Sequence, residues 1–414
     1  MEMPEEAKKW VDKHREQAHN KDMDNLGRAV LGNPMVSRIF GTEEEVFLVG
    51  GYLRDILRGV QSKDIDFVVR GDPRSRVSRI FPEGEGSVIG FRETLLVRVV
   101  VGDTTVDFSE LKGKIEEDLA RRDFTVNAIA WSPERGIIDP LGGVSDIRKG
   151  RLRGISEKNF VDDPLRLLRA YRFAAELGWT IDQRTRKIIR KLKHSTRVSA
   201  TERITLELYK LLNAEGSVNA LKQAFKDGLL EEIIALDINR LKDNIKAISR
   251  LDSFLKKIPQ ELRSGLDKTF SQGLSLIGLL RAEQLLYGSD IHRSNLSLSR
   301  AILKRLVVTM KLLDAYTYTK KEDLNDLKIF DLFAEAGDAV MDLALLTKKV
   351  SFHRKAERFL QISPVLAAEE VMRVTGLGSG PELGRILHEM KKVQFLGKIK
   401  DEEGARKWLA GRGD

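Results

Sequence analysis

The stretch that most constrains the fold is residues 46–70, VFLVGGYLRDILRGVQSKDIDFVVR, which reads as a strand, a glycine turn, a helix and a second strand. Residues 46–49 are β-forming and end at Gly50 and Gly51, and residues 52–57 then take up helical spacing. Two glycines at a strand end let backbone N–H groups approach a phosphate closely, and the N-terminus of the following helix attracts negative charge. This stretch therefore predicts a phosphate-binding turn.

The second strand carries two carboxylates, Asp64 and Asp66. Because side chains alternate along a strand, both would lie on one face, about 6 to 7 Å apart, with Ile65 and Phe67 in the core. Two carboxylates at that distance repel each other unless a cation lies between them. Taken alone, the pair is also typical of a turn or a solvated strand edge. After a phosphate-binding turn, with Arg54 as a counter-charge, it predicts a two-metal site for phosphoryl transfer.

Composition narrows the class of protein. The chain has 414 residues, enough for about two to four domains, and its 42% apolar and 32% charged residues are typical of globular proteins. It contains no cysteine, which excludes disulfides, thiolate nucleophiles and cysteine metal sites. The charged N-terminus and the lack of a long apolar run predict a cytoplasmic protein that does not span a membrane. The net charge of +9 favours a polyanionic partner.

The chain divides into a mixed part and a helical part. Strand patterns occur at residues 46–49, 65–69, 87–91, 95–101, 105–108 and 129–131. Beyond Phe160 they nearly disappear, and amphipathic helices are expected at residues 164–177, 182–193, 201–214, 217–227 and 299–319. We therefore expect an α+β protein, with a mixed sheet and helices in residues 1–155 and helical domains at 156–215, 216–335 and 336–414.

A third acid, Asp107, lies in the expected strand TVDF at residues 105–108. If its side chain faces the same way as the first pair, it would be a third metal ligand or the base that accepts a proton from an attacking hydroxyl group. An aspartate on a solvated edge strand explains the same pattern equally well. The sequence leaves both interpretations of Asp107 open.

Residues 117–128 read EDLARRDFTVNA, with Arg121 and Arg122 at one end of an apolar segment. In isolation this is typical of an ordinary helix with a salt bridge. In order after the Gly-Gly and Asp-x-Asp motifs, it resembles the RRDFTxNA motif of the class II tRNA nucleotidyltransferase and bacterial poly(A) polymerase family. The DPLGG turn at residues 139–143 resembles that family's DPxGG turn. The resemblance implies a polymerase-β-type nucleotidyltransferase head followed by an all-α neck, body and tail.

Residues 162–178, DDPLRLLRAYRFAAELG, predict a helix that ends at Gly178, with an aspartate before Pro164 as its cap. Asp163 and Arg166 are three residues apart and are expected to share one helix face. A carboxylate accepts hydrogen bonds, whereas a guanidinium only donates them. Cytosine and adenine each offer an amino donor beside a ring-nitrogen acceptor, and uracil and guanine present the reverse order. This pair would therefore accept C and A and reject U and G without a template.

The resemblance assigns roles to individual residues. Asp163 and Arg166 match the family's EDxxR motif, which reads the incoming base, although Asp162 replaces the usual glutamate. Asp64 and Asp66 are implied to be catalytic and to bind Mg²⁺, and Asp107 joins them as a catalytic candidate on the strand pattern given above. The other residues implied to bind the nucleotide are Gly50, Gly51, Arg54, Arg122, Asp123, Asn127 and Arg169. Basic helices of the body and tail would hold the tRNA acceptor arm and its 3′ end.

The resemblance leaves the added nucleotide open. The expected substrates are CTP, ATP or both, with addition of CCA, of CC or of A alone. Only residues 109–115 separate the TVDF strand from the next motif, where many CCA-adding members have a much longer loop, and a short loop resembles CC-adding members. The alternatives are a poly(A) polymerase, and a non-catalytic RNA-binding protein on the same scaffold.

Overall fold

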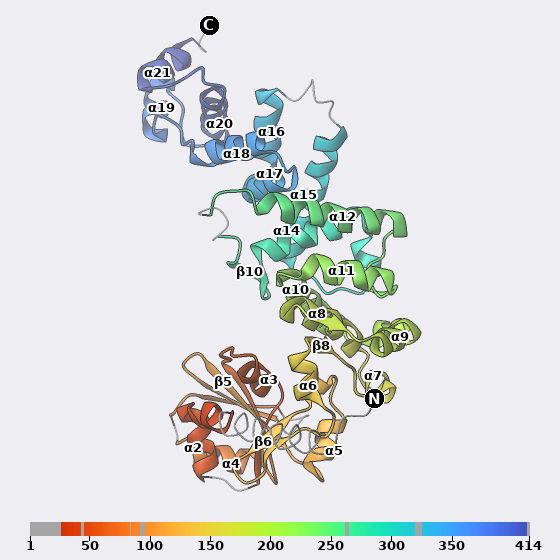
Figure 1. Ribbon diagram of the computed structural model, residues 1–414. Coiled ribbons are helices and arrows are strands. Elements are labelled where there is room, and N and C mark those ends of the chain that lie inside the picture. Colours follow the sequence, from red (N-terminus) through yellow and green to blue (C-terminus); the bar gives the residue numbers. More distant parts are fainter. Residues whose placement is uncertain are drawn as a thin grey trace. The chain divides into compact units, whose positions relative to one another are not determined.

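The computed structural model describes residues 26–42, 45–82, 84–91, 96–260, 265–318 and 325–411. The chain forms two compact units (Figure 1). Unit 1 contains the described residues up to Ala200 together with Gln223–Glu232, and unit 2 contains Thr201–Lys222 and the described residues from Ile233 onward. All the candidate site residues fall in unit 1, so the site can be described within a single unit.

Unit 1 is built on a seven-stranded sheet with the order β3-β4-β5-β2-β1-β6-β7. Only β2 and β5 run parallel, and the other neighbouring pairs are antiparallel. The strands are β1 (Val46–Val49), β2 (Asp64–Val69), β3 (Ser87–Phe91), β4 (Leu96–Val101), β5 (Thr104–Glu110), β6 (Ala130–Ser132) and β7 (Gly136–Ile138). The six expected strands are confirmed, except that Leu95 lies outside the described residues. The three-residue strand β7 was missed because it is too short to show an alternating pattern.

The alternation predicted for β2 is confirmed. Ile65 and Phe67 are buried, whereas Asp64 is exposed and Asp66 is partly exposed. The Phe67 ring stacks on that of Phe108 from β5, with ring centroids 5.5 Å apart. Both faces of β2 contribute to the core, because Val68, on the same face as the acids, is also buried, and only the end of that face that bears Asp64 and Asp66 stays accessible.

Helices in unit 1 connect and cover these strands. They are α2 (Pro34–Thr42), α3 (Gly51–Leu57), α4 (Pro73–Ile80), α5 (Ile115–Ala120), α6 (Gly143–Arg148), α7 (Glu157–Asp162), α8 (Leu165–Leu177) and α9 (Gln183–Leu192). Helix α8 ends at Gly178 with φ 70°, as expected for a glycine C-cap. Asp182 caps α9 by accepting a hydrogen bond from the backbone N–H of Arg184 at 2.9 Å. A short parallel pair, β8 (Arg151–Leu152) and β9 (Thr180–Ile181), links the segments before and after α8.

Unit 2 is helical, as predicted. Its helices are α10 (Thr201–Asn213), α12 (Ile238–Leu255), α14 (Leu276–Leu285), α15 (Arg300–Tyr318), α16 (Asp326–Ala336), α17 (Val340–Leu346), α18 (Val350–Gln361), α19 (Ala368–Thr375), α20 (Pro381–Phe395) and α21 (Glu402–Ala410). Helix α11 (Ser217–Lys226) contributes residues to both units. The unexpected element is a short ribbon of β10 (Thr269–Ser271) and β11 (Leu274–Ser275).

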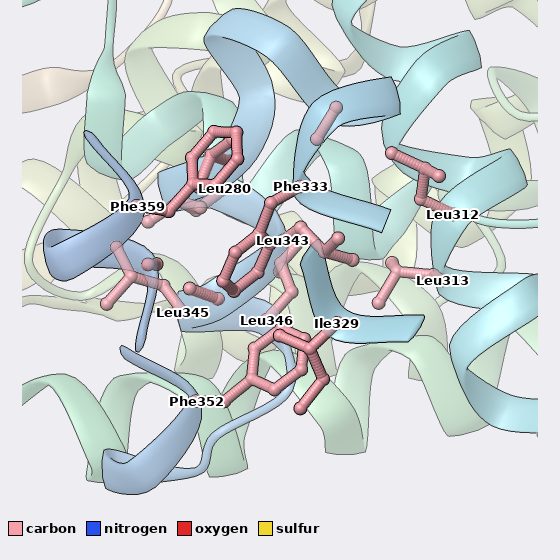
Figure 2. Packing of buried hydrophobic residues seen from close by; sticks show 14 of the residues in the cluster. Leu280, Leu312, Leu313, Ile329, Phe333, Leu343, Leu345, Leu346, Phe352 and Phe359 are labelled. Carbon is pink, nitrogen blue, oxygen red and sulfur yellow. The ribbon is translucent and has the colours of Figure 1, made fainter. Parts of the chain in front are cut away.

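Apolar clusters of described residues pack the helices of unit 2 together. A large one packs aromatic rings from α16, α18 and α20, among them Phe330, Phe333 and Phe359, against leucines of α14, α15 and α17 (Figure 2). A smaller one joins α19, α20 and α21 through Val371, Met390 and neighbouring residues. Among the helices that the structure describes, none combines the length and the apolar character needed to cross a bilayer.

Candidate active site

The site is built around acids on two neighbouring strands. In the register of β2 and β5, Asp66 pairs directly with Asp107, and Asp64 pairs with Thr105. Arg98 on β4 pairs with Asp107 from the other side. It donates hydrogen bonds from Nε to Oδ1 and from Nη2 to Oδ2 of Asp107, each 2.7 Å long. Asp107 therefore lies beside Asp66, in the interior of the sheet, with a guanidinium holding both of its oxygens.

The neighbourhood of Asp66 favours a bound cation. Burial raises the pKa of the Asp66 carboxyl, and the nearby Asp107 and Asp64 raise it further, while Arg122 and Arg98 oppose the shift without cancelling it. Negative charge concentrated in this way is relieved by a divalent cation. No three His, Asp or Glu side chains of the described residues form a metal cage. An acidic pair open to substrate phosphates still suits an ion such as Mg²⁺, which typically uses one or two carboxylates and phosphate oxygens.

The glycine turn at Gly50 and Gly51 lies next to Asp66. Gly50 has φ 73°, a conformation that residues with a side chain rarely adopt. A β-carbon on Gly50 would lie 3.0 Å from Arg122 Nη1 and 3.7 Å from Asp66 Oδ2. The backbone angle thus requires a glycine, a side chain here would crowd the Arg122 guanidinium, and Gly51 begins α3 immediately after it. The turn brings the backbone next to both a carboxylate and a guanidinium.

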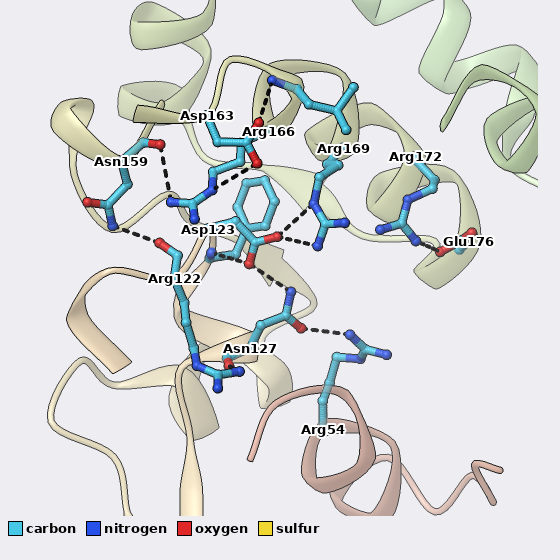
Figure 3. Close-up of polar contacts among 12 residues, drawn as sticks. Arg54, Arg122, Asp123, Asn127, Asn159, Asp163, Arg166, Arg169, Arg172 and Glu176 are labelled. Carbon is cyan, nitrogen blue, oxygen red and sulfur yellow. Dashed lines mark hydrogen bonds and ion pairs between the residues drawn. The ribbon is translucent and has the colours of Figure 1, made fainter. Parts of the chain in front are cut away.

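A chain of hydrogen bonds runs from α3 to α8 (Figure 3). Arg54 Nη1 donates to Asn127 Oδ1 at 2.7 Å, and Asn127 Nδ2 donates to Asp123 Oδ1 at 3.0 Å. Asp123 Oδ2 accepts two hydrogen bonds from Arg169, at 2.7 and 3.0 Å. The side chains of Arg54, Asn127, Asp123 and Arg169 are therefore tied to one another.

Asp123 is buried, but its hydrogen-bond and charge partners favour the ionised form of its carboxyl group. Burial alone would raise the pKa of its carboxyl, but Arg169, Asn127 and the backbone N–H of Phe124 together lower it. The Arg169 guanidinium also lies over the ring of Phe173, 5.2 Å from the ring centroid, and that of Arg54 lies 5.4 Å from the same centroid. The Arg169 guanidinium is thus held by the Asp123 carboxylate, and the Arg54 guanidinium by the Asn127 amide. Both also lie against the ring of Phe173.

Arg122 is held by an acid that the sequence analysis did not single out. Its Nε and Nη2 donate to Asp118 Oδ2 at 3.1 and 3.0 Å, and its Nη1 donates to the backbone carbonyl of Asn127 at 3.4 Å. Asp118 is almost fully buried and also accepts a hydrogen bond from Arg121. The four-residue spacing of Asp118 and Arg122 was a signal that could have revealed this pair, although α5 ends at Ala120, before Arg122.

The expected base-reading pair is close together, but it is not on one helix. Asp163 has φ −141° and ψ 93° and lies in the break between α7 and α8, because the Pro164 ring disfavours helical geometry in the residue before it. The prediction that Asp163 shares a helix face with Arg166 is therefore wrong. Arg166 Nε still lies 3.9 Å from Asp163 Oδ2.

Asp163 also fulfils the capping role expected for one of the two aspartates. Its Oδ1 accepts a hydrogen bond from the backbone N–H of Leu165 at 3.3 Å. Arg166 is anchored from the other side, because its Nη1 donates to the backbone carbonyls of Arg121 at 2.9 Å and Asn159 at 3.1 Å. Asp163, the proposed acceptor for the base, and Arg166, the proposed donor, are thus each fixed by hydrogen bonds with the backbone.

The connection between β5 and α5 is short. Strand β5 ends at Glu110 and α5 begins at Ile115, so four residues, 111–114, join them. Leu111 is buried against the sheet, and its N–H donates to the Val69 carbonyl at 2.7 Å. No long loop lies between the strand that bears Asp107 and the helix that precedes Arg122.

Two parts of the chain match known families. Residues 46–153 match the poly A polymerase head domain, and residues 178–236 match the domain described as the probable RNA and SrmB-binding site of polymerase A. A CC-adding tRNA nucleotidyltransferase from Synechocystis sp. is 30% identical over 86% of this chain and 91% of the relative. An A-adding tRNA nucleotidyltransferase from Deinococcus radiodurans is 28% identical over 87% of this chain and 94% of the relative.

Solved structures with the same fold include Thermotoga maritima CCA-adding enzyme complexed with tRNA, with a TM-score of 0.76 and 20% identity over 95% of this chain and 98% of that one. A CCA-adding enzyme in complex with CTP has a TM-score of 0.75 and 19% identity, with the same coverage of both chains. At this identity the likeness concerns the fold, and it confirms the expected α+β architecture.

Proposed function

The chain belongs to the class II tRNA nucleotidyltransferase and bacterial poly(A) polymerase family, and from this premise we propose that it adds cytidine to the 3′ end of tRNA. CTP is the proposed substrate, pyrophosphate is the proposed leaving group, and no nucleic-acid template is needed. The curated relatives over most of the chain are named tRNA nucleotidyltransferases. They support this reaction class over a poly(A) polymerase or a non-catalytic RNA-binding protein.

The short connection at residues 111–114 is the observation that carries the choice of CC addition. In the family, a longer loop at this place is associated with the change of the pocket from C to A. A connection this short has no spare length to reach across a nucleotide site. Two long-matching relatives, from Synechocystis sp. and Thermus thermophilus, are named CC-adding enzymes.

An A-adding enzyme is the second candidate. The A-adding relative from Deinococcus radiodurans matches a similar share of the chain at 28% identity. The reading edge formed by Asp163 and Arg166 offers an acceptor and a donor, which suit adenine as well as cytosine. Base choice therefore has to be measured directly.

In the proposed reaction, the 3′-hydroxyl oxygen of tRNA forms a bond to the α-phosphorus of the nucleotide as the bond to pyrophosphate breaks. Asp64 and Asp66 would hold Mg²⁺, which supplies charge neutralisation for the attacking and leaving oxygens when bound. Asp107, engaged by Arg98, adds negative charge beside Asp66. Arg122 would contact the phosphates, and its position next to Gly50 supports this role.

The other nucleotide-binding residues of the proposal act through the hydrogen-bonded chain. This chain fixes the position of α3 relative to α8 through the side chains of Arg54, Asn127, Asp123 and Arg169. A nucleotide would therefore meet a preorganised pocket. Gly50 and Gly51 leave room for the triphosphate against the backbone. Asp163 and Arg166 would then read the base.

For the whole chain, we propose a head at residues 1–155, a neck at 156–215, a body at 216–335 and a tail at 336–414, in a cytoplasmic protein. Basic helices outside the head would bind the acceptor arm of tRNA through its phosphates. The match of residues 178–236 to a probable RNA-binding domain supports this arrangement.

The test supplies purified protein, Mg²⁺ and one nucleoside triphosphate at a time to tRNA that ends at the discriminator base, and to tRNA that already ends in CC. Addition of two C residues to the first substrate and no addition of A to the second is the expected result. Addition of A alone, only to the CC-ended tRNA, would establish the A-adding alternative. Long A tails on unrelated RNA would overturn the assignment to tRNA.

A further inference from the structure

Three consecutive backbone carbonyl groups, those of residues 120–122, are each held by a side chain from α7 or α8. Asn159 Nδ2 donates to the carbonyl of Ala120 at 2.8 Å and to that of Arg122 at 2.7 Å. Arg166 Nη1 donates to the carbonyl of Arg121 between them, at 2.9 Å. The segment that carries Arg122 is thus fastened to the element that carries the base-reading arginine.

Asn159 uses its side chain and its backbone carbonyl in this arrangement, and Figure 3 shows its contacts with Arg122 and Arg166. The side chain is buried, with 6% of the residue exposed. Its Oδ1 accepts a hydrogen bond from Ser156 Oγ at 2.8 Å, which orients the amide so that Nδ2 faces the two carbonyls. Its backbone carbonyl accepts the second hydrogen bond from Arg166 Nη1, at 3.1 Å. Asn159 therefore contacts both Arg166 and the Arg122 segment.

We propose that Asn159 is a positioning residue for base selection, an inference that deepens the proposed function and rests on it. Arg166 can discriminate between bases only if its free edge has a fixed place relative to the phosphates of the same nucleotide. Arg122 lies at the phosphate end, beside Gly50 and Asp66. Asn159 sets the separation of these two arginines through backbone atoms, without touching the nucleotide. Small displacements of positioned groups have large effects on rate and selectivity.

The substitution Asn159→Asp tests this role with little change in shape. It replaces the N–H donor by an oxygen that faces two carbonyl oxygens, so both hydrogen bonds are lost. Unit 2 provides a matched control in Asn244, which is 3% exposed and donates from Nδ2 to the carbonyls of Leu285 at 3.0 Å and Tyr287 at 2.8 Å. Asn244→Asp makes the same chemical change in a buried amide that has no contact with the reading pair.

The measurement is kcat/KM for CTP and for UTP on the same tRNA, with the unfolding midpoint of each variant recorded beside it. We expect the ratio of CTP to UTP to fall about 10- to 100-fold in Asn159→Asp, since a displaced Arg166 no longer favours one base edge. The same ratio should stay within about twofold of the wild-type value in Asn244→Asp, even where the two variants lose similar stability.

An equal loss of both rates in Asn159→Asp, with the CTP to UTP ratio unchanged, would show a merely structural role and overturn the proposal. If Asn159→Asp does not fold, Asn159→Ser, which removes the amide without adding charge, decides the question by the same ratio. A wild-type protein that adds no C to tRNA contradicts the proposed function instead. If that protein selects ATP over GTP, the positioning role is tested by the ratio of those two substrates.

Discussion

Asp66 on β2 and Asp107 on β5 are directly paired across the only parallel junction of the seven-stranded sheet. Burial raises the pKa of the Asp66 carboxyl, and the negative charge of Asp107 beside it raises that pKa further. Arg98 donates hydrogen bonds to both oxygens of Asp107, so the Asp107 carboxylate has a defined orientation. Asp66 is thereby left as the inner carboxylate available to a cation.

Removing the charge of Asp66 should abolish nucleotide addition. For Asp66→Asn we expect kcat to fall roughly a thousandfold or more, because a metal ion contributes several kcal/mol of transition-state stabilisation. Asp103→Asn is a suitable control, since Asp103 is exposed and its carboxylate pairs with Lys63. The check is single-turnover incorporation of labelled CTP, and full activity of Asp66→Asn would refute the metal assignment.

Exchanging the two base-reading residues should reverse base preference. In the double variant Asp163→Arg with Arg166→Asp, the order of donor and acceptor is inverted, so we expect UTP and GTP to be used in preference to CTP and ATP. The exchange also removes the cap on α8 and the contacts of Arg166 with two carbonyls, costing about 1 kcal/mol or more for the cap alone. Ratios of kcat/KM therefore have to be compared rather than absolute rates. Unchanged preference for C and A would contradict the assignment.

Binding of tRNA should weaken steeply with salt, and α9 should contribute to it. Arg186 and Arg190 of this helix bind the buried Asp227, whereas Arg184 and Lys187 are exposed and form no ion pair among the described residues. We expect Arg184→Gln with Lys187→Gln to lower affinity and to reduce the slope of log K against log salt by about one to two. Filter binding or fluorescence titration at several salt concentrations measures this, and an affinity that hardly changes with salt would contradict phosphate contacts.

Replacing one buried acid in unit 2 should stabilise the protein above acidic pH. Glu283 on α14 is fully buried, and Thr309 donates a hydrogen bond to its Oε1 at 2.7 Å. Burial raises the pKa of Glu283 well above its usual value, and the neighbouring Asp342 raises it further. A carboxyl with a raised pKa in the folded state stabilises the fold while it is protonated, and this contribution is lost as the pH rises.

For Glu283→Gln, which keeps the neutral form at every pH, we therefore expect a higher unfolding midpoint than wild type near pH 8 and a smaller difference near pH 5. Thermal unfolding across this range provides the measurement. Glu403→Gln, at an exposed position on α21 that pairs with Lys407, should show no such pH-dependent gain. A variant of Glu283 that is less stable than wild type at pH 8 would argue against a protonated side chain.

Much of the secondary structure follows from local patterns. The strands at 46–49 and 87–91 were predicted with the bounds that the structure has, and α8 ends at the expected glycine. Asp163 is the instructive exception, because the spacing of three residues indicated a shared helix while Pro164 displaced the helix start. The pair still came together, since the break holds Asp163 next to the first turn of α8.

Residues that position the site residues through hydrogen bonds could not be predicted from local patterns. Arg98 and Asn159 belong to no recognised motif. Arg98 binds Asp107, 9 residues away in sequence. Asn159 binds the carbonyls of Ala120 and Arg122, which are 39 and 37 residues away. Asp118 is the exception, because its i,i+4 spacing to Arg122 is visible in the sequence.

The sequence by itself determined that Asp64 and Asp66 share one face of β2, the glycine turn before them and the order of the family motifs, because strand alternation and glycine geometry are local properties of the backbone. The tertiary structure alone decided that Asp107 lies beside Asp66 and that Arg98 donates hydrogen bonds to both oxygens of Asp107. It also decided that Asn159 links the Arg122 segment to α8. These contacts depend on strand register and on the path of the chain between distant segments, which local preferences do not specify.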